Sequence, residues 1–226
     1  MIAGVLRTRT VVLAYHKPRG LVTTHSDEHG RETVYDRLLP RLSSELRAER
    51  WHAVGRLDKD TTGLLLFTND GAFVHHATQP ATGLSKVYLV LAKGILREED
   101  LAPLREGVEL TGGLGRSGPA KADLLGHGVA TTWLSLEIAE GKNREVRRML
   151  LAIGSQAIRL QRVQVGGLAL DLEEDEWRRV TPREVEEKLG YRGAPPTSSR
   201  PPAPSRSTSR RPDRSGGSRR RPRPGR

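Results

Sequence analysis

The sequence has no cysteine, few aromatic residues and no long apolar run, and each absence excludes or disfavours a class of site or protein. Without cysteine, the 226-residue chain has no disulfide bond, no thiolate nucleophile and no cysteine-ligated zinc. No apolar run approaches the roughly 20 residues that a membrane helix needs, and the start of the chain is too polar for a secretory signal. We therefore expect a soluble, cytoplasmic protein that does not associate with membranes.

The positive charge is concentrated at the C-terminal end. The chain carries +11, and residues 191–226 hold 11 arginines against one acid, Asp213, for a net of +10. The first 190 residues thus carry only +1, so a nucleic-acid site there must come from local clusters. Residues 191–226 also hold 8 of the 14 prolines. We predict one folded domain over residues 1–190 and a disordered basic tail, which either contacts RNA phosphates or only solubilises the protein.

Short apolar runs and two helical patterns indicate an α+β fold. Strands and helices are interspersed without regular βαβ spacing, which predicts a mixed, largely antiparallel sheet flanked by helices and loops. Pro40 is expected to interrupt the first helix, and Asn143 to cap the second. The expected strands lie at 11–15, 21–24, 64–68, 87–91 and 132–138, and the expected helices at 33–47 and 143–153.

Charged and small polar residues are densest at 55–62, immediately before an apolar strand. Asp58 and Asp60 match the start of a calcium loop, but Asn69 stands where that loop needs a bidentate glutamate. The same pair could serve two-carboxylate sugar hydrolysis, because residues i and i+2 share a face in extended chain. An aromatic content of 4% leaves little material for stacking on sugars, which argues against that reading. An ordinary charged turn is the remaining alternative, and we predict no metal.

A second cluster spans 140–149 and holds several cations near the expected helix start. On a helix, Arg144 and Arg148 share a face, and Arg147 lies beside them. Cations at a helix N-terminus are unfavourable, because the helix macrodipole is positive there. The cluster therefore indicates an anion or a carboxylate nearby that compensates the positive charge. A solvated basic face is the alternative.

Three segments, in this order and spacing, resemble the RNA pseudouridine synthases. Val54–Gly71 resembles the family signature, Glu140–Met149 resembles a second signature of the branch that acts on ribosomal RNA, and Lys17–Gly20 resembles that branch's opening turn. The likeness covers roughly residues 11–182 and is greatest to the E subgroup of large-subunit enzymes, although 170–177 departs from it. It implies the pseudouridine synthase fold over residues 1–190 without a separate N-terminal RNA-binding domain.

The resemblance also implies a reaction and roles for residues. The expected reaction isomerises uridine to pseudouridine in ribosomal RNA, with 23S rRNA a better candidate than 16S rRNA or tRNA, by a monomer that uses no cofactor. Asp58 matches the nucleophile, Tyr88 the active-site tyrosine and Arg147 the basic partner of the aspartate. Arg56 is expected to enter the RNA helix in place of the flipped uridine. The residues expected to bind RNA are Arg56, Lys17, Lys86, Lys142, Asn143, Arg144 and Arg148.

Overall fold

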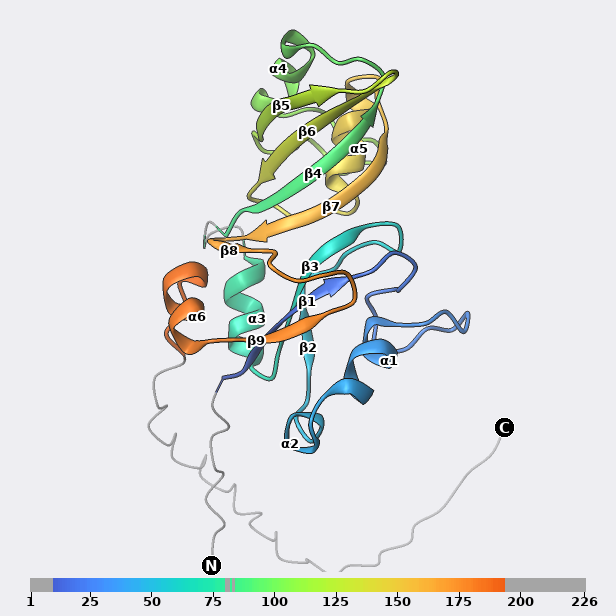
Figure 1. The fold of residues 1–226 in the computed structure, drawn as a ribbon. Coiled ribbons are helices and arrows are strands. Elements are labelled where there is room, and N and C mark those ends of the chain that lie inside the picture. Colours follow the sequence, from blue (N-terminus) through green and yellow to red (C-terminus); the bar gives the residue numbers. More distant parts are fainter. Residues whose placement is uncertain (1–9, 80–81, 83, 194–226) are drawn as a thin grey trace, which may run out of the picture. The chain divides into compact units, whose positions relative to one another are not determined.

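A nine-stranded sheet forms the frame of the protein (Figure 1). The computed structural model describes residues 10–79, 82 and 84–193. The strand order is β5-β6-β4-β7-β3-β1-β9, with β2 paired to β3 and β8 paired to β7. Among the named strands that the structure describes, only β3 and β7 run parallel, through Thr62 and Gly63. The prediction of a mixed, largely antiparallel sheet in an α+β fold is thus confirmed.

The strands are β1 (Val12–Lys17), β2 (His52–Val54), β3 (Thr62–Thr68), β4 (Lys86–Lys93), β5 (Lys121–His127), β6 (Thr131–Ile138), β7 (Ala157–Val165), β8 (Leu168–Ala169) and β9 (Trp177–Val180). The α-helices are α1 (Val34–Leu38), α2 (Ser44–Arg47), α3 (Gly71–Thr78), α4 (Ala102–Glu106), α5 (Glu145–Ala152) and α6 (Pro182–Leu189), and short 3-10 helices are η1 (Leu39–Arg41) and η3 (Glu98–Leu101). No helix in the described part of the chain is long and apolar enough to cross a membrane.

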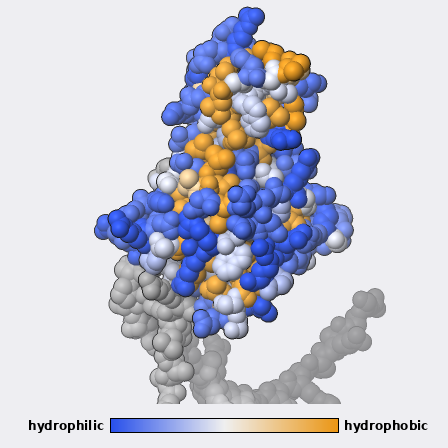
Figure 2. Space-filling model, viewed as in Figure 1, coloured by the Kyte–Doolittle hydropathy of each residue, from blue (hydrophilic) through white to orange (hydrophobic). Residues whose placement is uncertain are grey.

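The two halves of the sheet differ in how their faces are covered (Figure 1). Strands β1 and β3 are buried on both faces, since α3 and α6 cover one side and α1 the other. Both strands are therefore apolar without alternation. In the other half, β6 alternates between buried and half-buried residues, and α5 packs on its buried face. In Figure 2, apolar residues gather along the middle of the face shown, and hydrophilic residues cover most of the rest.

The two halves meet where β3 and β7 approach each other closely. Gly63 has φ of 108°, and a side chain there would overlap the backbone of Arg162 on β7. Only glycine combines this backbone conformation with such an approach at low cost. Gly63 therefore fixes the start of β3, directly after the segment that carries Asp58 and Asp60.

Two expected elements differ from the structure. The strand expected at Leu21–Thr24 is wrong: only Val22 forms an isolated bridge, to Thr33, because this segment bonds to the loop before β3 instead of a sheet strand. The helix expected at 33–47 is divided into α1, η1 and α2, as Pro40 predicted.

The fold extends slightly past the expected boundary at residue 190. Tyr191 stacks edge-on against Phe73 at 5.1 Å between ring centroids, and its hydroxyl donates to Asp70 at 2.7 Å. Residues 194–226, which make up most of the predicted basic tail, lie outside the described residues. The tail's predicted disorder therefore stays a prediction.

Candidate active site

Asp58 lies in the loop 55–61, between β2 and β3, and backbone contacts fix this loop. The Thr23 hydroxyl donates to the Leu57 carbonyl at 2.8 Å and accepts from the Leu57 amide at 3.4 Å. The Gly20 amide donates to the Lys59 carbonyl at 2.9 Å. The loop is thus tied to the segment after β1 on both sides of Asp58, and a rigid mount of this kind suits a reactive group.

Lys17, the last residue of β1, also holds this loop in place. It stands opposite Gly63 in the β1–β3 pairing, and its ammonium group donates to the carbonyls of Pro18 and Thr61 at 2.9 Å and of Lys59 at 3.5 Å. The residue is fully buried, and burial lowers the pKa of its ammonium group to about 8. Lys17 therefore positions the Asp58 loop and has no exposed surface for the RNA contact expected from the sequence.

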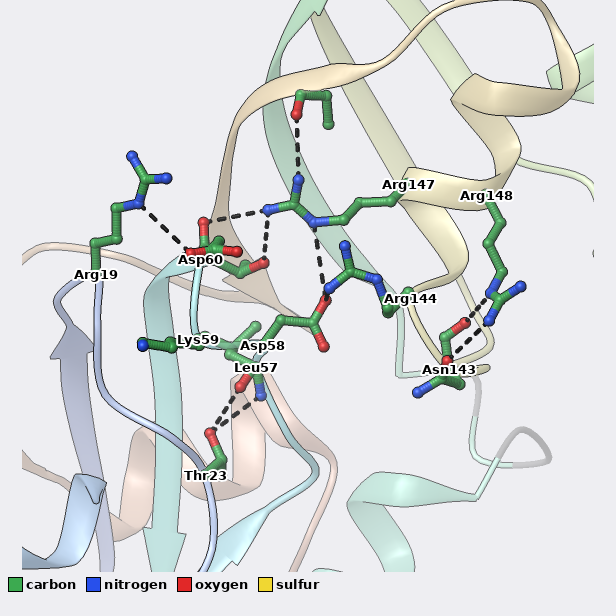
Figure 3. A network of polar contacts seen from close by, with 12 residues as sticks. Arg19, Thr23, Leu57, Asp58, Lys59, Asp60, Asn143, Arg144, Arg147 and Arg148 are labelled. Carbon is green, nitrogen blue, oxygen red and sulfur yellow. Dashed lines mark hydrogen bonds and ion pairs between the residues drawn. The ribbon is translucent and has the colours of Figure 1, made fainter. Parts of the chain in front are cut away.

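Two arginines from the start of α5 converge on one oxygen of Asp58 (Figure 3). Arg144 Nη1 donates to Asp58 Oδ2 at 3.2 Å, and Arg147 Nε lies 3.8 Å from the same oxygen. The resemblance assigned this pairing to Arg147 alone and placed Arg144 on the RNA. Both cations therefore orient the carboxylate that lies between them.

Arg147 is the more constrained of the two. Its terminal nitrogens donate to the carbonyls of Asp60 at 3.2 Å and Ala157 at 3.1 Å, and its side chain is 13% exposed. Its Nε is buried and has no hydrogen-bond partner among the described residues, so the ion pair with Asp58 is its compensation. Burial, and next the charge of Arg144, lower the pKa of the Arg147 guanidinium.

The remaining basic residues of this cluster face a neighbouring loop. Arg148 donates to the Asn143 carbonyl at 3.0 Å and to the Thr111 carbonyl, and it points away from Asp58 (Figure 3). Lys142 donates to the Arg116 carbonyl at 2.6 Å. Both side chains thus support the loop 111–118, an internal role that the sequence did not indicate.

The residue before α5 is Arg144, in the left-handed conformation with φ of 50° and without a capping side chain. The expected cap at Asn143 is therefore wrong. The Asn143 side chain instead accepts from Arg148 at 3.2 Å. Arg144 therefore begins the helix in a conformation that is unusual for a helix start, and from there its side chain reaches Asp58.

A cavity of about 170 Å³ opens beside Asp58. A water molecule occupies about 30 Å³ in the liquid, so the cavity has room for a planar group of several heavy atoms. Among the residues that line it are Arg56, Asp58, Lys86, Tyr88, Glu145 and Arg162. A second hollow, of about 410 Å³, lies across Arg56, Asp58 and Arg144 and is lined mainly by residues 22–31. Asp58, Tyr88, Arg56 and Arg144 thus line one cavity, and Arg147 lies outside its lining and contacts Asp58.

Tyr88 and Lys86 enter this cavity from β4. The Tyr88 ring packs against two of the apolar clusters, and no hydrogen bond of its hydroxyl is found within the described residues. Lys86 is half-buried and donates to the Ala139 carbonyl at 3.1 Å. Burial, and next the charge of Arg162, lower the pKa of the Lys86 ammonium group. An aromatic face and a cation therefore stand together at the cavity wall.

Sequence reasoning missed two cavity residues, Glu145 and Arg162. Arg162 is 5% exposed, and its Nε donates to the Leu64 carbonyl at 2.7 Å. Nothing in the strand sequence around it distinguishes it from a surface arginine. Glu145 was visible as the single acid among the cations of 142–148, which is an available signal. No cluster of potential metal ligands occurs among the described residues.

Comparison with known proteins gives consistent relatives. The profile of the RNA pseudouridylate synthase family matches residues 11–152. The chain is 42% identical over 163 residues to ribosomal large subunit pseudouridine synthase B of Salmonella typhi, and 41% identical to that of Escherichia coli K12. Both alignments cover 70% of this chain and 52% of the relative, so the chain spans about half the length of these curated relatives.

A solved structure, described as a pseudouridylate synthase, is 34% identical with a TM-score of 0.70, over 80% of this chain and 74% of the other. The relatives reported above carry the B name. The expected likeness to the E subgroup therefore stays a prediction.

Proposed function

The chain belongs to the RNA pseudouridylate synthase family and has that family's fold, and we propose that it converts uridine to pseudouridine in large-subunit ribosomal RNA. The observation that carries this proposal is Asp58, a carboxylate that two arginines contact beside a small cavity, which an aromatic ring also lines. The names of the relatives support the large-subunit substrate, 23S rRNA. We further propose that the protein acts as a monomer in the cytoplasm, without metal or cofactor.

The reaction needs a nucleophile that attaches to an electrophilic carbon and later leaves. The bond between N1 of uracil and C1′ of ribose breaks, a bond between C5 and C1′ forms, the C5 proton leaves and N1 gains a proton. Asp58 is the proposed nucleophile, because it lines the cavity and Arg144 and Arg147 hold its carboxylate in place. Whether the carboxylate attacks the sugar or the base, both routes require it to be charged.

The cavity provides the other parts of this mechanism. The Tyr88 ring can stack on the flipped uracil, and its hydroxyl can assist removal of the C5 proton. Arg56 lines both hollows, so its guanidinium can take the place that the flipped uridine leaves in the RNA helix. Lys17 acts on the chemistry only through the loop that it supports.

The test is the Asp58→Asn variant with pseudouridine mapping on 23S rRNA transcripts. Because the amide is a poor nucleophile of similar shape, we expect the single-turnover rate to fall at least about a thousandfold while RNA affinity changes little. Asp60→Asn is the matched control, because the Asp60 side chain is exposed and, among the described residues, its ion pair is with Arg19 at 3.7 Å. An Asp58→Asn rate within about tenfold of wild type would sink the assignment.

The mass of the product separates this reaction from hydrolysis of the same bond. Isomerisation leaves the mass of the RNA unchanged, whereas a nucleosidase releases free uracil. Release of uracil by the wild-type protein would therefore replace the proposed reaction with hydrolysis.

A further inference from the structure

Glu145 is a buried carboxylate at the wall of the cavity beside Asp58. It is the first residue of α5 and is 4% exposed. Its Oε2 accepts a hydrogen bond from the Lys142 amide at 3.0 Å. Its Oε1 has no hydrogen-bond partner within the described chain, yet Oε1 is not sealed from solvent, and the residue lines the cavity. One oxygen thus has a structural role, and the other is available at the cavity.

Such a carboxylate is expensive to bury unless something bonds to it. Burial, and less strongly the charge of Glu140, raise the pKa of Glu145. The hydrogen bond from the Lys142 amide and the positive charges of Lys142 and Lys86 oppose this shift. Closure of the first turn of α5 needs only Oε2. An N–H donor that enters the cavity would satisfy Oε1.

Uracil in RNA carries one polar hydrogen on its ring, at N3. The proposed reaction exchanges N1 for C5 at C1′, and these two atoms flank C6. A half-turn of the free base about the C6–N3 axis makes this exchange and also swaps O2 with O4, but it leaves N3–H in place. An acceptor at N3–H is therefore the polar contact that can persist before and after the turn.

We propose that Glu145 recognises uracil by accepting the N3–H hydrogen bond through Oε1 and so holds the base on its turning axis. The proposal rests on the proposed function and names the group that selects the base. Lys86, from the facing strand, is placed to donate to whichever of O2 and O4 lies next to it. Cytosine presents a lone pair at N3, which repels a carboxylate, so the same contact excludes cytidine.

The test measures binding of uridine 5′-monophosphate, cytidine 5′-monophosphate and N3-methyluridine 5′-monophosphate to the full chain by NMR titration. A hydrogen bond to a charged group implies that wild type binds the uridine nucleotide about ten- to a hundredfold more tightly than the other two. In Glu145→Leu the three affinities should become equal within about twofold. Glu145→Gln retains an acceptor and should keep part of the preference.

The matched control is Glu140→Gln. Glu140 lines the same cavity, but both of its oxygens are already used, by the Gly118 amide at 2.5 Å and by Lys142 at 2.8 Å. This variant should keep the full preference. Preference unchanged in Glu145→Leu would overturn the proposal, and so would wild-type protein that binds the N3-methyl nucleotide as well as the unmethylated one. The second result needs no variant and holds even if Glu145→Leu does not fold.

Conversion of ribosomal RNA is measured in parallel to separate the two proposals. If wild type discriminates the nucleotides through Glu145 but forms no pseudouridine, the proposed function fails and the recognition role stands. If wild type forms pseudouridine while Glu145→Leu keeps both the nucleotide preference and the rate, only the recognition role fails.

Discussion

The negative charge of Asp58 is paired with two arginines that differ in how exposed and how firmly held their side chains are. Arg147 is 13% exposed in its side chain and anchored by backbone carbonyls, whereas the Arg144 side chain is 44% exposed and bonds only Asp58 among the described residues. The buried Nε of Arg147 has no hydrogen-bond partner among the described residues and depends on its ion pair with Asp58, while an exposed arginine can exchange the carboxylate for an RNA phosphate. We infer that Arg147 is the permanent partner and Arg144 the exchangeable one.

This difference predicts separate effects for Arg147→Met and Arg144→Met. Arg147→Met removes the buried partner, so we expect the single-turnover rate at saturating enzyme to fall by about a hundredfold or more. Arg144→Met leaves Arg147 in place, so its rate should stay within about tenfold and its RNA affinity should fall. Rates and binding titrations on the same transcript measure both. The reverse pattern would mean that Arg144 is the essential partner.

At the scale of elements, the loop 55–61 depends on β1 through Lys17. The ammonium group has three N–H bonds and contacts three carbonyl oxygens, those of Pro18, Lys59 and Thr61. Loss of its proton leaves fewer donors than acceptors. Because burial lowers the pKa of Lys17 to about 8, this loss falls within an accessible pH range.

We predict opposite pH trends for stability and activity above pH 8. The unfolded chain keeps its lysine proton up to about the ordinary pKa of 10.5, so from pH 8 to 10.5 the unfolded state binds more protons, and the Lys17 contribution to the free energy of unfolding rises with pH. The single-turnover rate should fall over the same range, because the neutral amine holds the Asp58 loop less firmly. Lys17→Met should have a low rate and lack this pH-dependent step in urea unfolding.

Lys93→Met is the control for this prediction, since Lys93 ends β4 and is exposed. It should keep the wild-type pH dependence of both rate and stability. A wild-type rate that stays flat across the pKa of Lys17 would contradict the positioning role.

Elements with strong local signals were predictable, and contacts between distant segments were not. The apolar runs of β1 and β3 and the alternation of β6 indicated strands correctly, because the order of apolar and polar residues within a strand reflects which of its faces are buried. The segment 21–24 looked like another strand, but its polar groups bond to the Asp58 loop more than 30 residues away in sequence. No local pattern contains that partner.

The candidate site shows the same limit. Asp58, Tyr88 and Arg147 were proposed through a family resemblance. In the structure Asp58 and Tyr88 line one cavity, and Arg147 contacts Asp58. The packing of β1, α5 and β7 determines three further features, which local sequence does not indicate. Lys17 is buried, Arg148 faces Thr111 and Arg162 lines the cavity. The residue types indicated the chemistry of the site. The packing determines which of these side chains face the cavity and which are used in internal contacts.

At the scale of the whole molecule, charge is distributed unevenly along the chain. Residues 194–226 hold 10 arginines and one acid, Asp213, for a net of +9, while the other 193 residues carry +2. Within the fold, several cations near Asp58 are already used in internal contacts, as Lys17, Lys142 and Arg148 show. Electrostatic attraction to RNA is therefore expected to come in large part from the C-terminal segment.

The last prediction is that deletion of residues 194–226 weakens RNA binding but spares the chemical step. The deletion starts after Gly193 because Tyr191 packs on Phe73, and an earlier cut would remove that contact. Each phosphate that an arginine neutralises releases counterions, so the log–log salt dependence of binding should become shallower by roughly 0.7 to 0.9 per lost contact. The choice of uridine should persist, because contacts to phosphates carry no sequence information.

Binding titrations of full-length and truncated protein, from low to physiological salt, measure this change in slope. Single-turnover rates at saturating enzyme provide the control, since saturation removes differences in affinity. Equal salt slopes would show that the segment does not contact RNA, and the solubilising role would remain. A truncated protein whose rate collapses even at saturation would show that the segment helps to form the active site, because loss of phosphate contacts alone affects binding and not the step at Asp58.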